Sequence, residues 1–270
     1  MSSFPHAPGF VAGDRPKVVT SRFEFADSYT IERYLATDGY AGLRKALAKS
    51  AADIHEEVKG ATVLGRGGAG FPTGIKWQTV AEQAPVPHKG DPVDAPRHKY
   101  ICVNADEGDS GTFADRMLME GDPFCLLEGM AIAAHAVGAD RGMIYLRSEY
   151  PAAIAVMSDA IEKARARGWL GEGILGSSCN FDVTIRVGAG SYVCGEETAM
   201  LESLEGRRGT VRAKPPLPAI EGLFGTPTVI NNVLTIASVP SILARGPEAY
   251  AELGQERSRG TQVFQLAGNI

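Results

Sequence analysis

A glycine-rich stretch in the first third of the chain constrains its fold and chemistry most. It runs from Gly65 to Trp77 with the sequence GRGGAGFPTGIKW, and five of its first ten residues are glycine. Backbone without Cβ atoms adopts positive φ angles easily and brings its N–H groups close to a ligand. Arg66 and Lys76 add positive charge, and Phe71 adds a flat apolar surface. This combination favours a ligand that carries phosphate, such as a nucleotide or a flavin, over an ordinary surface loop.

The loop also matches the pattern G-x-G-x-x-G of dinucleotide-binding folds. That fold needs a strand before the loop, a helix directly after it and an acid about 20 residues further on. A strand at 61–64 would be very short, and residues 71–74 are expected to interrupt any helix before Ile75. No strand that ends in an acid is expected after the loop, because residues 84–98 are rich in proline. The sequence therefore argues against the usual dinucleotide arrangement at this loop.

Composition and cysteine spacing exclude several classes of protein. The net charge of −5, without a basic stripe, argues against nucleic acid as a partner. No run of about 18 apolar residues is present, so we expect no direct membrane insertion. The polar stretch Met1–Lys17 is no signal peptide, which predicts a cytoplasmic protein with a loosely held N-terminal arm. Because Cys102, Cys125, Cys179 and Cys194 form no C-x-x-C motif, we expect four reduced thiols and neither a zinc site nor an iron–sulfur cluster in this chain.

Hydrophobic periodicity predicts the order of the elements. Helices are expected at 29–36, 41–49 and 51–59, before the glycine-rich stretch. Further on, strands at 100–103, 143–146 and 181–187 alternate with helices at 123–137, 151–167 and 196–205. Asp122 followed by Pro123 is typical of a helix start. The alternation predicts an α/β fold with a parallel sheet and flanking helices.

Three regions are expected along the chain. Residues 1–60 form an N-terminal arm and helical segment, 61–245 the ligand-binding α/β domain, and 246–270 the start of a truncated further small domain. Residues 84–97 hold four prolines and predict an inserted surface loop. Helices are expected at 233–245 and 247–254, and residues 261–266 are expected to begin a new strand.

An acidic segment follows the first predicted strand, at the sheet edge where parallel α/β folds bind ligands. It reads NADEGDSGT from Asn104 and contains Asp106, Glu107 and Asp109. Clustered carboxylates can bind a divalent cation. They can also accept hydrogen bonds from a flavin ring N–H and from ribityl hydroxyl groups. Both interpretations stay open on the residues alone.

Two further segments have structural as well as functional explanations. After the third strand, GAGSYVCGEET places Glu196 and Glu197 in the first turn of a helix, where acids favour the helix macrodipole. In PTVINNVLT, the adjacent Asn231 and Asn232 can simply cap a helix. Beside a glycine-rich loop, both pairs are also candidates for ligand contacts.

The glycine-rich block and these three segments, in this order, resemble a known family. It is the NADH-oxidising flavoprotein subunit of respiratory complex I, with its relatives, the diaphorase subunits of NAD-linked formate dehydrogenases and hydrogenases. The resemblance runs from about Tyr40 to Gly246 and implies a Rossmann-like domain that binds FMN and NADH. The segment Asp109–Phe124 looks most like the formate dehydrogenase branch.

Residue by residue, the resemblance implies a cofactor site. It implies FMN contacts from Gly65, Arg66, Gly67, Lys76, Asn104, Asp106, Tyr192, Gly195, Glu196, Asn231, Asn232 and Thr235. NADH contacts are implied near Phe71, Glu197 and Lys214, and the cofactor-binding set is completed by Gly68, Ala69, Gly70, Glu107 and Asp109. Glu107 and Glu197 are expected to tune the flavin and to place the nicotinamide, and no metal is expected.

The chain also departs from the family pattern. Asp109 stands where relatives in complex I carry the longer glutamate. Gln78 and Leu217 occupy positions that are aromatic in some relatives, near the adenine end of the dinucleotide. The family's cysteine-rich domain with a [4Fe–4S] cluster is absent from these residues and is expected only in a missing C-terminal part.

The function implied is that of an FMN-dependent NADH dehydrogenase, or diaphorase, module. Hydride would pass between NAD(H) and FMN, and single electrons would then pass to iron–sulfur clusters of a larger complex. Expected partners are a thioredoxin-like [2Fe–2S] subunit and a catalytic formate dehydrogenase or comparable subunit, with complex I or an NAD-reducing hydrogenase as alternatives. The rival from another class is a non-catalytic nucleotide-binding assembly subunit.

Overall fold

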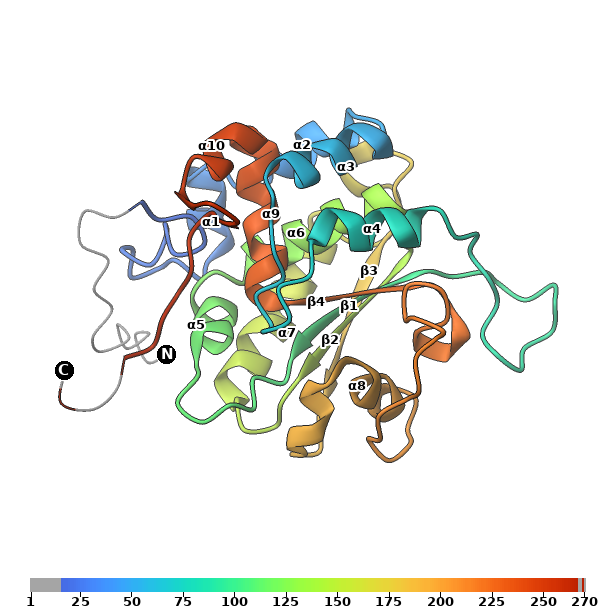
Figure 1. Cartoon of the computed structure of the whole chain (residues 1–270). Coiled ribbons are helices and arrows are strands. Elements are labelled where there is room, and N and C mark those ends of the chain that lie inside the picture. Colours follow the sequence, from blue (N-terminus) through green and yellow to red (C-terminus); the bar gives the residue numbers. More distant parts are fainter. Residues whose placement is uncertain (1–15, 267–268, 270) are drawn as a thin grey trace.

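A parallel sheet of four strands lies at the centre of the computed structural model, which describes residues 16–266 and 269 (Figure 1). The strand order is β3-β2-β1-β4. The strands are β1 (Tyr100–Ala105), β2 (Arg141–Leu146), β3 (Asp182–Val187) and β4 (Thr228–Asn232). Helices connect them, as parallel pairing requires. The predicted α/β fold is confirmed.

Helices form most of the remaining regular structure. They are α1 (Ile31–Ala36), α2 (Ala41–Leu47), α3 (Ala51–Gly60), α4 (Thr73–Ala81), α5 (Ala114–Gly121), α6 (Pro123–Val137), α7 (Pro151–Ala166), α8 (Glu197–Leu204), α9 (Val233–Arg245) and α10 (Pro247–Ala251). Short 3₁₀ turns η1, η2 and η3 lie at Ile174–Gly176, Tyr192–Gly195 and Leu223–Gly225, and β5 (Gly254–Gln255) pairs with β6 (Ser258–Arg259) in a small hairpin. Pro123 and Pro151 begin α6 and α7, where a missing N–H costs nothing.

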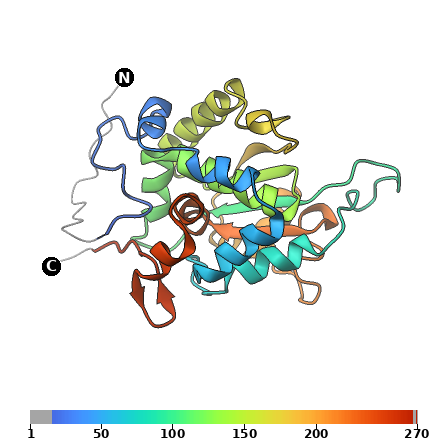
Figure 2. The same ribbon diagram turned by 90° about the horizontal axis from the view of Figure 1, so that it is seen from above.

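The larger hydrophobic core lies between the sheet and the helices above it (Figure 2). Alternate residues of β1, Ile101 and Val103, face this side and are fully buried with residues of α2, α3, α4, α6 and α9. Gly129 allows α6 and α9 to pack closely, because a Cβ there would lie 2.3 Å from the carbonyl oxygen of Ile236. This contact fixes α9, whose first turn follows directly from the end of β4.

The opposite face of the sheet carries a smaller core. Tyr100 and Cys102 of β1 and Tyr145 of β2 pack there against Met200 and Leu201 of α8. In Figure 1, α8 lies below the sheet, and most of the other helices lie above it. The sheet is therefore covered on both faces, as expected for parallel strands.

A buried carboxylate on α6 attaches the N-terminal helices to the domain. Glu128 is 1% exposed and accepts hydrogen bonds from the backbone N–H of Tyr40 at 2.7 Å and of Leu43 at 2.8 Å. The hydroxyl of Tyr34 donates to the same carboxylate. Tyr40 precedes α2, and its own side chain makes no capping hydrogen bond. The N–H groups at the start of α2 are bonded instead by Glu128, which lies on α6.

Several local predictions need correction. The sheet has four strands rather than three, because residues 228–232 form β4 beside β1. The helix α5 was not predicted, and α4 begins at Thr73, directly after Pro72, rather than at Ile75.

The predictions for the C-terminal end were partly wrong. The helix predicted at 247–254 ends at Ala251. The strand predicted at 261–266 is wrong, since those residues carry no strand pairing and Phe264 and Leu266 are largely exposed.

The predicted regional boundaries remain predictions, although one observation bears on them. Residues of α1, α2 and α3 share the larger core with residues of the 61–245 region. Residues 84–97 form an extended loop at one end of the sheet, closed by a bridge between Val86 and His98 (Figure 1). The predicted arm at 1–17 lies almost entirely outside the described residues. Among the described helices, none is long and apolar enough to cross a membrane.

Candidate functional site

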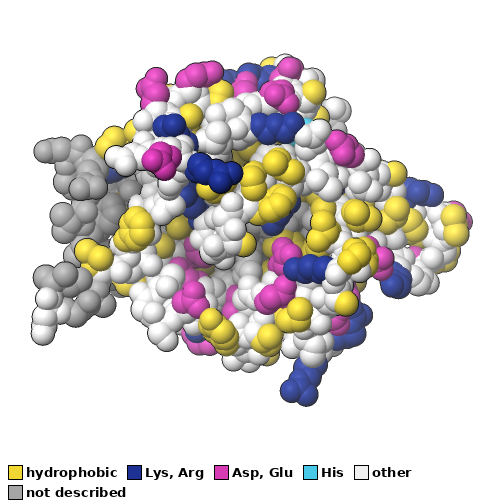
Figure 3. Space-filling view, in the orientation of Figure 1, with side chains coloured by type: hydrophobic (Ala, Val, Ile, Leu, Met, Phe, Trp, Pro, Cys, Tyr) yellow, Lys and Arg dark blue, Asp and Glu magenta, His cyan; other side chains and the backbone are white. Residues whose placement is uncertain are grey.

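The candidate site lies where the strands end. Ala105, Leu146 and Val187 are paired in register at the carboxyl ends of β1, β2 and β3, and Asn104 is paired with Asn232 of β4. The acidic segment, the segment before α8 and the asparagine pair therefore meet at one edge. Figure 3 shows acidic and basic side chains around a hollow in this face of the molecule, above α8.

The glycine-rich stretch folds into a tight loop over this edge. The N–H of Gly65 donates to the carbonyl of Phe71 at 2.9 Å, and the N–H of Thr73 donates to the carbonyl of Val63 at 2.9 Å. Residues 66–70 form the tip between these bonds. Gly68 and Gly70 have φ angles of 100° and 62°, which other residues rarely adopt.

Exposed backbone donors line the tip. In the described part of the chain, no residue accepts a hydrogen bond from the N–H groups of Gly67, Gly68, Ala69 or Gly70. The exposed ring of Phe71 stands next to them.

The loop rests on the first turn of α9. The N–H of Arg66 donates to Oγ1 of Thr235 at 2.9 Å, and a Cβ at Gly67 would lie 3.3 Å from Cβ of Asn232. Asn232 caps α9 by accepting a hydrogen bond from the N–H of Leu234 at 2.9 Å. Loop N–H groups and a helix N-terminus therefore converge on one small region, which is the arrangement that binds phosphate.

The guanidinium of Arg66 points away from this region. It donates to the carbonyl of Arg259 at 2.6 Å and to the hydroxyl of Tyr250 at 3.3 Å. The expectation that the Arg66 side chain lends its charge to the loop therefore needs correction: its guanidinium holds the β5–β6 hairpin, and its backbone N–H holds the loop. The sequence offered no signal for this contact, because the partners lie far along the chain.

Lys76 and Trp77 of α4 face the end of β4. The ammonium of Lys76 donates to the carbonyl of Ile230 at 2.8 Å and lies 3.8 Å from the carboxylate of Glu197. Burial lowers the pKa of Lys76, and Glu197 opposes that shift. The indole N–H of Trp77 donates to Oδ1 of Asn231 at 2.9 Å, so the amide N–H groups of Asn231 stay available for a ligand.

Asp106 is the carboxylate best placed to receive a ligand hydrogen bond. It is 4% exposed, and no side chain or backbone group of the described residues donates to its carboxylate. Burial raises the pKa of Asp106 to about 6, although Arg147 opposes the shift. Oδ2 of Asp106 would lie 3.4 Å from a Cβ at Gly195 and 3.5 Å from one at Gly108. Both glycines therefore keep the space in front of this carboxylate open.

Neighbouring residues frame that space. Asn104 donates through its amide to the carbonyl of Gly195 at 2.8 Å and ties the β1 end to the η2 turn. The hydroxyl of Tyr192 donates to Asp109 at 2.8 Å, and the Tyr192 ring would lie 2.8 Å from a Cβ at Gly108. The tyrosine ring is 70% exposed, so it is available to a flat ligand.

Glu107 has contacts that differ from the expected role in tuning a flavin. Its carboxylate accepts hydrogen bonds from the N–H groups of Asp115 at 2.8 Å and Arg116 at 3.0 Å, at the start of α5. The hydroxyl of Tyr150 donates to the same group at 3.1 Å. Glu107 therefore caps the start of α5, and its own backbone has a positive φ of 34°.

The two glutamates at the start of α8 make different contacts. Glu196 caps the helix, since its Oε2 accepts hydrogen bonds from the N–H groups of Thr198 at 2.8 Å and Ala199 at 2.9 Å. Burial alone would raise the pKa of Glu196, but these hydrogen bonds and Lys214 lower it below its ordinary value. Glu197 is the first residue of α8, and its carboxylate accepts a hydrogen bond from the ammonium of Lys214 at 2.6 Å. A carboxylate between two lysines thus borders the hollow.

Together these residues fit a flavin nucleotide. The loop donors and the α9 start suit the phosphate, the buried Asp106 suits a ring N–H, and the exposed Tyr192 and Phe71 suit flat rings. Within the described residues, no group of three or more His, Cys, Asp and Glu side chains could hold a metal ion.

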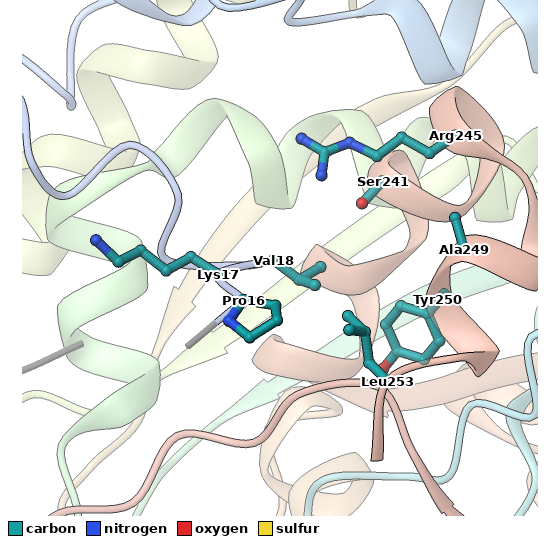
Figure 4. A pocket seen from close by; sticks show the side chains of 8 residues that line it. All are labelled: Pro16, Lys17, Val18, Ser241, Arg245, Ala249, Tyr250 and Leu253. Atoms are coloured by element: carbon teal, nitrogen blue, oxygen red, sulfur yellow. The ribbon is translucent and has the colours of Figure 1, made fainter. Parts of the chain in front are cut away.

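A separate cavity takes no part in this arrangement. It measures about 170 Å³ and lies between the segment at 16–18 and helices α9 and α10, lined by Lys17, Ser241, Arg245 and Tyr250 among others (Figure 4).

Sequence reasoning missed several residues of the site. Asp115, Arg147 and Tyr150 surround Glu107, although none was expected to take part. Asp115 follows the unpredicted start of α5, so a search for helix capping in the acidic segment would have drawn attention to it. Arg147 and Tyr150 carry no comparable signal, because only the sheet brings the end of β2 to the end of β1.

Comparisons with known proteins agree with this geometry. Residues 58–241 match the family model of the Nuo51 FMN-binding domain. The F 2 subunit of the NADH-quinone oxidoreductase of Rhizobium meliloti is 49% identical over 94% of this chain and 58% of its own length. The HndC subunit of the NADP-reducing hydrogenase of Solidesulfovibrio fructosivorans is 45% identical over 94% of this chain and 49% of its own length. The chain thus spans about half to three-fifths of these relatives.

A solved structure has a similar fold. A NAD+-reducing [NiFe]-hydrogenase in the H2-reduced state has a chain that superposes with a TM-score of 0.69 at 39% identity, covering 79% of this chain and 34% of that one. The resemblance drawn from the sequence motifs is confirmed. The chain therefore belongs to the Nuo51 FMN-binding domain family of oxidoreductase flavoproteins.

Proposed function

We propose that this chain is the NADH-oxidising FMN module of a larger, cytoplasmic redox complex. The observation that carries the proposal is the loop at 66–70, whose free N–H groups lie over the start of α9, at the same sheet edge as the buried Asp106 after β1. That arrangement offers a phosphate site and a ring acceptor within one hollow. The family membership supports the same reading.

Each residue has a definite task in this proposal. Residues 67–70 donate to the FMN phosphate, and Asp106 accepts from the flavin ring. Tyr192 and Phe71 enclose the flat rings, and the amide of Asn231, held by Trp77, donates to the flavin. When bound, FMN supplies hydride acceptance from NADH and one-electron release. The chain's own contribution is to hold the two rings in contact and to exclude water.

Glu197 is proposed to place NADH. Its carboxylate lies between Lys76 and Lys214 at the border of the hollow, and it serves no helix cap. Glu107 is proposed to act on the flavin only through the α5 start, because its carboxylate is already occupied by three donors.

The electron acceptors are proposed to lie outside this chain. We infer a thioredoxin-like [2Fe–2S] subunit and a [4Fe–4S] cluster in further sequence of the same protein. Formate dehydrogenase is our first proposal for the catalytic partner, on the resemblance of the segment Asp109–Phe124. Complex I and NAD-reducing hydrogenase are the alternatives, which the names of the matched relatives support.

A spectroscopic experiment separates catalysis from mere nucleotide binding. The purified chain should be yellow with bound flavin and should reduce a soluble dye with NADH. Since its cysteines form no cluster motif, it should show no iron–sulfur EPR signal after reduction with dithionite. Colourless protein that binds nucleotide without dye reduction would favour the assembly role, and a stoichiometric cluster signal would contradict a chain that carries flavin alone.

Glu197→Gln is expected to narrow the preference for NADH over NADPH. A carboxylate near the adenosine ribose accepts from the 2′-hydroxyl and repels a 2′-phosphate. Two like charges about 4 Å apart at an effective dielectric near 20 oppose each other by up to about 4 kcal/mol. Because salt and the two lysines screen this repulsion, we expect roughly a tenfold to a hundredfold change in the ratio of the two kcat/KM values, mostly through NADPH.

The control for this substitution is Asp159→Asn, which removes one exposed acid on α7 that is paired only with Lys163. It should leave the ratio unchanged. If Glu197→Gln lowers kcat/KM equally for both dinucleotides, Glu197 acts at the nicotinamide end or on the lysines, and the ribose assignment is wrong.

A further inference from the structure

Arg147, directly after β2, holds the backbone on both sides of Asp106. Its N–H donates to the carbonyl of Ala105 at 3.4 Å, and its guanidinium donates through Nη1 to the carbonyl of Glu107. In the described part of the chain, no hydrogen bond joins this guanidinium to the carboxylate of Asp106. Arg147 therefore acts on the residue between these two carbonyl groups through the backbone.

The backbone beside Asp106 needs such support. Glu107 has a φ of 34°, which residues with a side chain rarely adopt and which persists only where the surrounding contacts fix it. The start of α5 fixes the carboxylate of Glu107, and Arg147 fixes its carbonyl. Without the contact to Arg147, Glu107 can relax toward an ordinary φ and turn the residue before it.

The guanidinium of Arg147 is itself fixed in place. It lies over the ring of Tyr150, 5.0 Å from the ring centroid, and donates to the carboxylate of Glu149 at 3.1 Å. The hydroxyl of Tyr150 in turn bonds the carboxylate of Glu107 at 3.1 Å. Only 22% of the Arg147 side chain is exposed. Arg147 is therefore a fixed part of the sheet edge and not a mobile surface cation.

We propose that Arg147 is a positioning residue of the flavin site, which fixes the backbone around Asp106 and so aims its carboxylate at the flavin ring N–H. The inference rests on the proposed function, in which Asp106 accepts that hydrogen bond. The carboxylate is 4% exposed and receives no hydrogen bond from the described residues. Its direction therefore depends on packing and on the backbone, whose N–H at Asp106 donates to Asn104 at 3.2 Å.

The test compares FMN with 3-methyl-FMN, in which a methyl group replaces the one N–H hydrogen of the oxidised flavin ring. Both ligands keep the ribityl chain and the phosphate, so they differ only at the atom that Asp106 is proposed to bind. In the parent protein, the dissociation constant of 3-methyl-FMN should exceed that of FMN by on the order of tenfold to a hundredfold, as one charge-assisted hydrogen bond implies. Quenching of flavin fluorescence measures both constants at about pH 8, above the pKa of about 6 of Asp106.

Two variants then test Arg147 through the ratio of these two constants. Arg147→Met removes every donor of the side chain and keeps much of its apolar volume, so the ratio should fall to within roughly threefold of one. Arg147→Lys keeps the charge, but its ammonium ends where the central carbon of the guanidinium lies, one bond short of Nη1. Its ratio should lie between those of the parent and Arg147→Met, and it answers the question if Arg147→Met does not fold.

The matched control is Arg165→Met on α7. Arg165 also donates to the carbonyl of a strand residue, Val183, at 2.7 Å, and it pairs with Asp182. Asp182 begins β3, so this contact lies at the end of the sheet opposite to the site. The control should keep the ratio of the parent, whatever stability it loses.

The outcomes also separate this inference from the proposed function. If the parent binds neither flavin, the proposed function fails. If the parent binds both flavins equally, Asp106 does not receive the ring N–H, and the role of Arg147 fails with that contact while FMN binding stands. If the parent discriminates and the Arg147 variants weaken both flavins by the same factor, Arg147 serves stability alone and the inference is refuted.

Discussion

Glu128→Ala is expected to lower the free energy of unfolding by about 3–5 kcal/mol, because it removes the acceptor for three buried donors. The N–H groups of Tyr40 and Leu43 and the hydroxyl of Tyr34 all donate to this carboxylate. Without it, these donors would remain in the packed interior between α2 and α6. For a chain of this size, the loss corresponds to a decrease in Tm of roughly 10 °C.

The matched control is Glu56→Ala on α3, whose side chain is 75% exposed and paired only with Lys59. A substitution of this kind usually changes stability by no more than about 0.5 kcal/mol. Glu128→Gln keeps one acceptor oxygen and should fall between the two. Thermal unfolding followed by circular dichroism measures all three, and equal Tm values for Glu128→Ala and Glu56→Ala would show that α2 is held by apolar packing alone.

Lys76→Ala is expected to weaken FMN binding by roughly a tenfold to a hundredfold. A charge-assisted hydrogen bond is worth about 1.5–3 kcal/mol, and the ammonium of Lys76 is a cation at the end of β4, beside the carbonyl of Ile230 and the carboxylate of Glu197. It uses one donor on the carbonyl of Ile230, so other donors remain for the flavin or its phosphate. Titration with FMN gives the dissociation constant directly.

Lys163→Ala serves as the control, since Lys163 is exposed on α7 and pairs only with Asp159. It should bind FMN as the parent does. Lys76→Arg keeps the positive charge and should lose less affinity than Lys76→Ala. An unchanged dissociation constant for Lys76→Ala would show that this lysine serves the carbonyl of Ile230 and the carboxylate of Glu197 instead of the flavin.

The sequence alone predicted the parts of the fold that depend on local physics. Local sequence is enough to predict apolar runs of strand length. It also predicts the helix starts at Pro123 and Pro151 and the end of α7 before Gly168, which has a positive φ. These signals placed three of the four strands and the helices α6, α7 and α8, but not α5. The same holds for the glycine-rich loop, since bare backbone with positive φ has few uses other than close approach to a ligand.

The fourth strand illustrates what local signals cannot decide. The segment at 228–232 ends in two asparagines, and one of them, Asn232, does cap α9 as the sequence suggested. Whether the residues before it form a strand depends on the free edge of β1, which accepts it by parallel pairing. The segment at 261–266 shows the reverse, because it forms no strand although it contains apolar residues, and Phe264 and Leu266 are largely exposed.

The sequence by itself determined which residue types meet at the edge of the sheet, because the ends of parallel strands lie together whatever their detailed packing. Only the tertiary structure decided where each charged side chain points. The guanidinium of Arg66 donates to Tyr250 and to the carbonyl of Arg259. The carboxylate of Glu107 caps α5. The carboxylate of Glu197 lies between two lysines at the hollow. The physical reason is that a buried or half-buried charge needs a hydrogen-bonding or ionic partner close to it in space. The partners found here lie far along the chain from the charged residues that they contact.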